Sequence, residues 1–147
     1  MPIRPATPQD LDRVRQIVAA AYGPYIAEIG QTPGPMLEDY EQVLASGHAH
    51  ILDAPMPVGL IVLIPEDDAM LLENMALDPA HQGQGHGSAL MRFAEDSTRA
   101  LGLSRIRLYT HAGMVRNQQI YRAMGYEETH RVTEHGLPRV YMAKPLD

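Results

Sequence analysis

The sequence contains no cysteine among its 147 residues. Disulfide bonds, thiolate metal sites and cysteine nucleophiles are therefore excluded together. No apolar run approaches the roughly 18 residues that a membrane-spanning helix requires. The N-terminal residues, Met1-Pro2-Ile3-Arg4-Pro5, also lack the apolar segment of a signal peptide. We therefore expect a cytoplasmic protein that does not bind a membrane.

The chain also lacks an excess of positive charge. Its 12 Lys and Arg residues face 18 Asp and Glu residues, for a formal net charge of −6. This balance argues against a nucleic-acid partner and mildly favours cationic ligands such as amines. The apolar content of 45% and mean hydropathy of −0.22 are those of a globular protein. Without internal repeats or linkers, residues 1–147 are expected to form a single domain.

Hydrophobic spacing and turn residues predict an α/β fold, a mixed sheet of about seven strands flanked on both faces by four helices. Tyr22 to Pro35, punctuated by Gly and Pro, is expected to be irregular and to contain at most a short helix. The predicted helices are Leu11–Ala21, Met36–Ala45, a segment from near Ser88 to Gly102, and Met114–Met124. The predicted strands are Ile3–Ala6, His48–Asp53, Val58–Ile64, Met70–Leu77, Arg105–Thr110, Tyr126–Glu134 and Val140–Lys144.

A glycine-rich stretch, Gln82-Gly83-Gln84-Gly85-His86-Gly87, separates the strand ending at Leu77 from the helix near Ser88. Alternate glycines let backbone N–H groups turn inward at the positive end of the following helix, which favours binding of a phosphate or pyrophosphate. The glycine spacing does not fit a Rossmann fingerprint, and no Lys-Ser/Thr pair follows as in a P-loop. The pattern that fits is Gln-x-x-Gly-x-Gly.

This pattern resembles the acetyl-CoA loop of the GNAT superfamily of N-acetyltransferases. A second run supports the resemblance: Asn117 and Tyr121 lie on a predicted helix that follows a strand, and Gly125-Tyr126 follow at its end. Leu108-Tyr109-Thr110 and Met114 precede this run, and the whole segment is similar to the same region of a bacterial GNAT subgroup. Many GNAT proteins place an Asn where Met114 stands, whereas Asn117 lies one helical turn nearer to Tyr121, on the same face. The role of Asn117 is therefore left open.

The resemblance implies acetyl-CoA as co-substrate, no metal ion and a mixed-sheet GNAT fold. The pyrophosphate would lie on the loop and the pantetheine arm beside the preceding strand. Acceptors in the family are small-molecule amines or amines of peptides and proteins, and a homodimer is possible on the same ground. The residues expected to bind the cofactor are Met75, Ala76, Leu77, Gln82, Gly83, Gln84, Gly85, His86, Gly87, Ser88, Asn117 and Tyr121.

Acetyl transfer to an amine needs a neutral amine and a proton for the leaving thiolate. Tyr121 suits the donor role because a phenol pKa of about 10 lies above that of a thiol, although a helical Tyr is often a core residue. Glu73, alone among apolar residues, is either a general base with a raised pKa or the partner of an arginine on a neighbouring strand. His111 or water is the alternative base.

The acceptor wall is expected to come from the irregular region, with Tyr22, Tyr25, Met36 and Tyr40 as candidates. Because the chain has no cysteine to carry an acetyl group, the resemblance implies direct attack in a ternary complex. The alternative to an enzyme is a non-catalytic acyl-CoA-binding or interaction module with the same fold.

Overall fold

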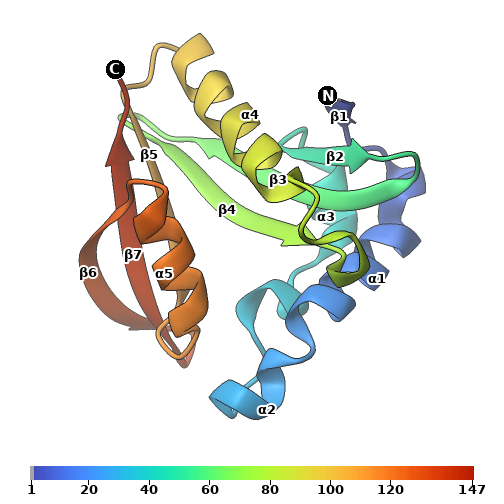
Figure 1. Cartoon of the computed structure of the whole chain (residues 1–147), viewed down its shortest axis with the longest axis horizontal. Coiled ribbons are helices and arrows are strands. Elements are labelled where there is room, and N and C mark those ends of the chain that lie inside the picture. The colour runs from blue at the N-terminus through green and yellow to red at the C-terminus, as the bar shows by residue number, and fades with distance from the viewer. Residues whose placement is uncertain (1) are drawn as a thin grey trace.

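A computed structural model describes residues 2–147, in which seven strands form one sheet in the order β1-β2-β3-β4-β5-β7-β6 (Figure 1). Neighbouring strands run antiparallel except β4 and β5, which are parallel, so the predicted mixed sheet is confirmed. The strands are β1 (Ile3–Pro5), β2 (Ala49–Asp53), β3 (Pro57–Pro65), β4 (Met70–Leu77), β5 (Arg105–His111), β6 (Glu127–Glu134) and β7 (Leu137–Pro145).

Helices cover both faces of the sheet and create two hydrophobic cores. On one face, α1 (Leu11–Tyr22) and α3 (Tyr40–Ala45) pack on β2, β3 and the end of β4. On the other face, α4 (His86–Ala100) packs on the central strands, and α5 (Val115–Ala123) lies against the same core. A short helix, α2 (Tyr25–Ile29), extends from the end of α1 (Figure 1). Along residues 2–147, none of the helices is both long and apolar enough to cross a membrane.

The structure corrects three element boundaries. The helix predicted over 36–45 is wrong as one piece: a 3₁₀ turn covers Gly34–Leu37, and α3 starts afresh because the Asp39 carboxylate caps its first N–H groups. The helix that follows the glycine loop begins at His86 rather than near Ser88. The last strand begins at Leu137, because the turn lies at His135 and Gly136, both with positive φ.

The start of the chain is fixed to the sheet by a buried carboxylate. Asp10, 7% exposed, accepts hydrogen bonds from the Thr7 backbone N–H at 2.8 Å and from the Arg4 guanidinium at 2.8 and 3.0 Å. Arg4 also bonds Asp53 at the end of β2. The hydrogen bonds from Arg4, more than those from Thr7, lower the pKa of Asp10 below its ordinary value. The carboxylate therefore connects β1, the entry to α1 and β2.

We predict that Asp10→Asn lowers the free energy of unfolding at pH 7 by about 2 kcal/mol, because charged hydrogen bonds are lost in a buried site. A lowered folded-state pKa stabilises the fold above the unfolded value and is lost as the pH falls through the folded value. The difference between wild type and Asp10→Asn should therefore shrink below about pH 4. Urea unfolding at several pH values measures it, with the exposed Asp12→Asn as control. Equal effects of the two substitutions would contradict the role of Asp10.

Candidate active site

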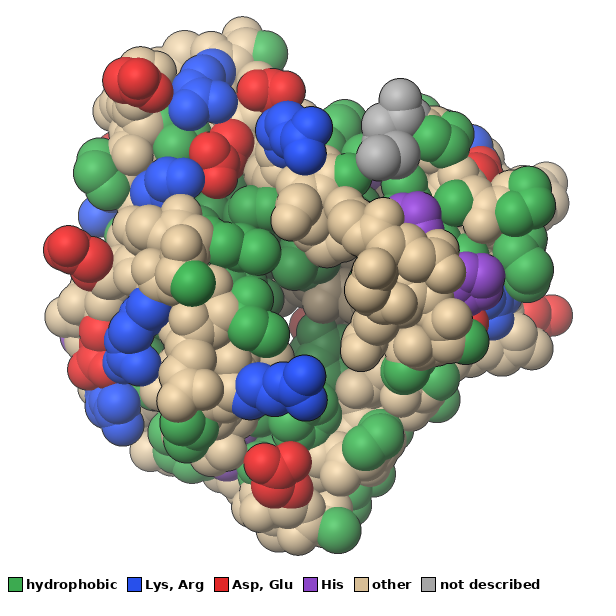
Figure 2. Space-filling view, in the orientation of Figure 1, with side chains coloured by type: hydrophobic (Ala, Val, Ile, Leu, Met, Phe, Trp, Pro, Cys, Tyr) green, Lys and Arg blue, Asp and Glu red, His purple; other side chains and the backbone are tan. Residues whose placement is uncertain are grey.

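The centre of the site is an opening between β4 and β5. The two strands pair only at Met70 with Ile106, Leu71 with Arg107 and Leu72 with Leu108. Beyond Leu72, β4 continues beside β3 while β5 continues beside β7, and Figure 1 shows the two pairs diverging. In Figure 2 the surface is hollowed between these two parts, and hydrophobic side chains line the hollow. The sheet is thus open at its middle without losing its outer pairings.

A bulge in β4 changes which face of the sheet its side chains occupy beside this opening. Val62 of β3 pairs with Asn74, whereas the next residue, Leu63, pairs with Leu72, so Glu73 is an extra residue. An inserted residue reverses the alternation of faces along a strand. Accordingly Leu72 and Met75 both belong to the core beneath α4, whereas the buried Asn74 points toward α1 and α3.

The glycine loop presents unpaired backbone donors, as the sequence indicated. Gly83 and Gly85 have φ of 80° and 81°, and Gly85 precedes the first residue of α4 without any side-chain cap. Within residues 2–147, the first N–H of this helix start with a backbone acceptor is that of Ala89, bonded to the Gly85 carbonyl at 3.1 Å. A Cβ at either glycine would meet no atom within 4 Å. The donors without an acceptor therefore lie at the positive end of α4, and the space beside the two glycines is open.

Two cavities meet in the opening, and four residues line both: Tyr22, Met75, Asn117 and Tyr121. The first, here called the loop cleft, lies between the glycine loop, the end of β4 and α5. The second, the strand pocket, lies between β4, β5, β7 and the turn at Pro33–Pro35. The predicted cofactor-binding residues that line the loop cleft are Met75, Ala76, Leu77, Gln82, Gly83, Gly85, His86, Gly87, Ser88, Asn117 and Tyr121.

Gln84 is the predicted cofactor-binding residue that does not line the loop cleft. Its side-chain oxygen lies 3.1 Å from Nε2 of His86, so it supports the loop from outside. The four acceptor-wall candidates also separate. Tyr22 lines both cavities, Tyr25 lines only the loop cleft, and Tyr40 lines a smaller pocket adjoining the strand pocket. Met36 lies on a separate depression.

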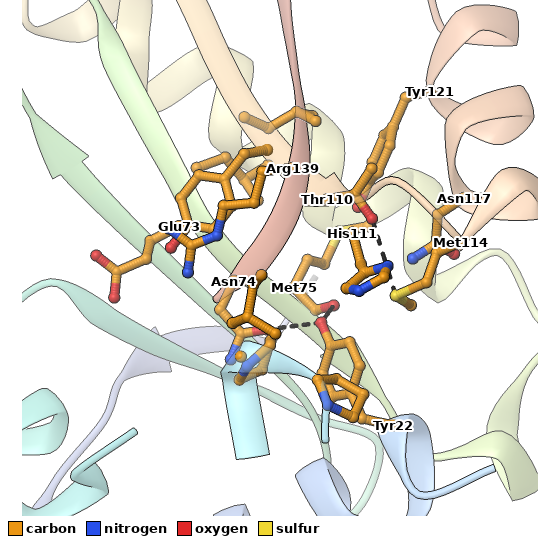
Figure 3. Close-up of a pocket in the computed structure, with 17 residues that line it drawn as sticks. Tyr22, Glu73, Asn74, Met75, Thr110, His111, Met114, Asn117, Tyr121 and Arg139 are labelled. Carbon is orange, nitrogen blue, oxygen red and sulfur yellow. Dashed lines mark hydrogen bonds between the residues drawn. The ribbon is translucent and has the colours of Figure 1, made fainter. Parts of the chain in front are cut away.

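Tyr121 points from α5 into the place where the two cavities meet (Figure 3). Burial, with a smaller contribution from Tyr25, raises the pKa of its hydroxyl to about 12. Among the described residues its hydroxyl has no hydrogen-bond partner, while its ring meets Tyr126 edge-on with centroids 6.0 Å apart. A neutral hydroxyl with an unused proton thus faces the cavity.

Glu73 lies at the other end of the strand pocket, with its carboxylate pointing away from Tyr121 (Figure 3). Burial raises the pKa of this carboxylate, the neighbouring Glu38 raises it further, and the charges of His48 and Arg139 act in the opposite direction. Within residues 2–147 no ion pair or hydrogen bond involves its carboxylate. The arginine-paired alternative for Glu73 is therefore not the arrangement in this structure.

A chain of hydrogen bonds orders β4 beside Tyr22. The Tyr22 hydroxyl lies 2.8 Å from Asn74 Oδ1 and 3.0 Å from the Met75 carbonyl. The Asn74 side-chain N–H donates to the Tyr40 hydroxyl at 3.0 Å, and that hydroxyl donates to the Pro35 carbonyl. The chain ties α1 and the turn before α3 to the free edge of β4.

His111 is occupied by structural contacts. Its Nδ1 accepts from the Gly113 N–H at 2.9 Å, which leaves the proton on Nε2 to donate to Gln31 Oε1 at 2.7 Å. Gln31 in turn donates to the Gly136 carbonyl at 3.0 Å. Burial lowers the pKa of His111, so the neutral ring is favoured. The ring joins β5 to the segment after α2 and to the β6–β7 turn, which makes it a poor candidate for the base.

Sequence reasoning missed the contribution of β7. The register places Arg139 opposite His111, and Leu137 and Arg139 both line the strand pocket. No local pattern marks these residues, because only the pairing of β5 with β7 brings them to the site. Within residues 2–147, no cluster of three or more His, Asp or Glu side chains is arranged to hold a metal ion.

A family model described as Acetyltransferase (GNAT) family matches residues 11–126. No curated protein matches the chain significantly by sequence. Three crystal structures illustrate the fold. Ribosomal-protein-S18-alanine N-acetyltransferase from Escherichia coli matches with a TM-score of 0.75 and 19% identity, covering 99% of this chain and 93% of that one. The paia N-acetyltransferase from Thermoplasma acidophilum, in complex with coenzyme A, matches with a TM-score of 0.75 and 17% identity, covering 97% of each chain. A GNAT family acetyltransferase from Listeria monocytogenes matches with a TM-score of 0.73 and 19% identity, covering 98% of this chain and 94% of that one.

We predict that His111→Ala costs about 1–2 kcal/mol of stability, because two hydrogen bonds are lost. A lowered His pKa in the folded state means that the unfolded chain binds more protons, so wild-type stability rises as the pH increases through about 6.5. His111→Ala should flatten that rise. Chemical unfolding between pH 5 and 8 measures both effects. Faster exchange of the Gly113 amide in the variant is the local signature, and unchanged exchange would contradict the proposed contact.

Proposed function

Because the chain belongs to the Acetyltransferase (GNAT) family, we propose that it transfers the acetyl group of acetyl-CoA to the amine of a small molecule, peptide or protein. The observation that carries this proposal is the meeting of the loop cleft and the strand pocket at Tyr22, Met75, Asn117 and Tyr121. Two cavities that share one set of lining residues suit a donor and an acceptor bound together. Direct attack in a ternary complex is proposed, since the chain has no cysteine to carry the acetyl group in a cysteine-linked two-step route.

The donor is proposed to occupy the loop cleft. Its pyrophosphate would accept hydrogen bonds from the free N–H groups between Gly83 and Ser88, where the dipole of α4 favours negative charge. The edge of β4 from Met75 to Leu77, which β5 leaves unpaired, offers backbone groups to the pantetheine arm. Asn117, facing the same cleft from α5, would contact the arm near the thioester. The coenzyme A bound to the T. acidophilum neighbour supports this choice of donor.

Tyr121 is proposed as the general acid. Attack by the amine nitrogen forms the C–N bond and breaks the C–S bond, which leaves a thiolate that needs a proton. The raised pKa keeps Tyr121 protonated at neutral pH, and the thiolate would form in the same buried surroundings, where its own basicity is increased. The proton that Tyr121 gives up is recovered from the amine by way of solvent.

Glu73 is proposed as the general base that takes a proton from the incoming ammonium group. Its raised pKa makes the carboxylate a better base than an exposed glutamate. Because the carboxylate points away from Tyr121, the transfer is proposed to run through a water molecule. This places the base at the acceptor end of the strand pocket and the acid at the donor end.

We predict that Tyr121→Phe lowers kcat by about 10²–10⁴-fold with little change in coenzyme A affinity, because only the transferable proton is removed. Thiol release from acetyl-CoA across a panel of amines measures kcat, and calorimetry measures the affinity. Tyr126→Phe is the matched control, since Tyr126 is buried in the core and its hydroxyl has the Met91 sulfur as its one hydrogen-bond partner within residues 2–147. Unchanged turnover in Tyr121→Phe would remove the assignment. Tight coenzyme A binding without turnover on any amine would instead indicate a binding module.

We predict that Glu73→Gln lowers kcat/KM by about 100-fold and removes the acidic limb of its pH profile. The carboxylate is the active form, so the wild-type rate should rise with pH through a pKa above the ordinary value of about 4.3. Glu38→Gln is the matched control: it removes a like charge that raises the pKa of Glu73. The limb should then move to lower pH with its plateau kept. Because amine deprotonation also raises the rate with pH, the comparison is made between variants on one acceptor. Identical limbs in all three proteins would exclude Glu73.

A further inference from the structure

Arg139 brings a rigid positive charge into the strand pocket. Its guanidinium carbon lies 4.3 Å from the centroid of the Tyr109 ring, and its side chain is only 15% exposed. Its Nη2 also lies close to Gly34, since a Cβ built on that glycine would be only 3.4 Å away. Nη1 donates to Glu134 Oε1 at 3.1 Å. The group is therefore fixed by an aromatic ring, a backbone turn and one carboxylate before any ligand arrives.

Most of the donors of this guanidinium are unused. A guanidinium carries five N–H groups, arranged so that two of them can bind one carboxylate side-on. Among the described residues its one hydrogen bond is that to Glu134, so at least one two-donor edge has no acceptor. Within residues 2–147 these unpaired nitrogens are not fully buried, so an acceptor that enters the pocket can reach them. Their place in the lining of the strand pocket indicates a ligand that carries the missing acceptor.

The charges around Arg139 restrict that ligand. Arg139 and Glu73 lie together at the end of the strand pocket that is remote from Tyr121 in Figure 3. Glu38 and Glu73 both line the adjoining smaller pocket, and Glu134 already pairs with Arg139. Three nearby carboxylates disfavour a doubly charged phosphate. A single carboxylate bound by Arg139 meets less repulsion from these groups, and the acidic surroundings favour a positive charge elsewhere on the same molecule.

We propose that the acceptor is an amine that also carries a carboxylate, and that Arg139 binds this carboxylate. The inference rests on the proposed acetyltransferase function and names the acceptor class. An amino acid with its amine at one end and its carboxylate at the other would span from the reaction centre to Arg139. Arg139 thereby acts as a specificity-determining residue on the side of the pocket away from the donor.

The test compares carboxylates with their neutral amides. Glycine, 3-aminopropanoate, 4-aminobutanoate and 6-aminohexanoate are each assayed beside the corresponding primary amide with acetyl-CoA. Wild type should prefer the carboxylate by at least about 10-fold in kcat/KM at the chain length that fits the pocket. Arg139→Met should reduce that preference to about 1, mainly through KM. Because the amides differ from the acids in amine pKa, the deciding quantity is the change in the ratio between proteins.

Two further variants separate recognition from folding. Glu134→Gln removes the ion pair but keeps the guanidinium, so it should retain the preference. Arg139→Lys keeps the charge without the two-donor edge and should give an intermediate ratio of carboxylate to amide kcat/KM. This variant replaces Arg139→Met in the test if Arg139→Met does not fold. A preference near 1 in wild type, or one unchanged in Arg139→Met, would overturn the inference. Loss of the preference in Glu134→Gln as well would also overturn it, because the ion pair alone would then be responsible.

The outcomes distinguish this inference from the proposed function. Efficient acetylation of the amides without any preference for the carboxylates leaves an acetyltransferase and rejects the role of Arg139. If none of these amines is acetylated, the acceptor class is wrong, and the wider amine panel with Tyr121→Phe decides whether the enzyme assignment survives. Calorimetric titration of 6-aminohexanoate into the protein with coenzyme A bound gives a readout independent of turnover. Binding there that is weakened about 10-fold or more by Arg139→Met supports the inference.

Discussion

The separation of β4 from β5 after Leu72 is the constraint on which the rest of the site depends. A continuous parallel pairing would consume the backbone groups of Met75 to Leu77 and close the space between the strands. Because β3 and β7 hold the outer edges of β4 and β5, the sheet opens without becoming two unpaired fragments. The β4 edge then has backbone groups that need partners, which a bound molecule can supply. The Tyr22 hydroxyl already meets one of them, the Met75 carbonyl.

The same burial acts on both proposed catalytic groups, with opposite chemical results. It raises the pKa of Tyr121 and so keeps a neutral proton donor beside the donor cavity. It also raises the pKa of Glu73 and so strengthens a base at the acceptor end. A single low-dielectric cavity can therefore supply acid and base at one pH, because one group is neutral and the other anionic in its resting form. His111 shows the contrast: its ring nitrogens are both committed to neighbouring groups, and it has little left to offer a substrate.

What could be predicted from the sequence depends on whether the residues that interact are close together or far apart along the chain. The glycine loop, the alternation of β5 and the helix carrying Tyr121 are local patterns, and the structure contains these elements where they were expected, within a few residues. The reversal of faces at Glu73 was not predictable, because it depends on the pairing of Val62 and Leu63 with β4. Arg139 was missed for the same reason, since a residue on β7 reaches the pocket only through its register with β5. The start of the second predicted helix was misplaced because the Asp39 cap divides a segment that reads as one helix.

The loop cleft is formed mainly by backbone groups and the strand pocket mainly by side chains, and this difference explains why the family is easier to identify than the acceptor. The loop cleft depends on backbone N–H groups and on the absence of side chains at Gly83 and Gly85, so a short motif in the sequence marks it. The strand pocket depends on side chains from β4, β5, β7 and a turn before α3, which no single motif contains. Donor recognition can therefore be common to many sequences, whereas acceptor choice changes with a few residues. In this chain the side chain that most restricts the choice is Arg139, because it is charged, held in place and short of hydrogen-bond acceptors.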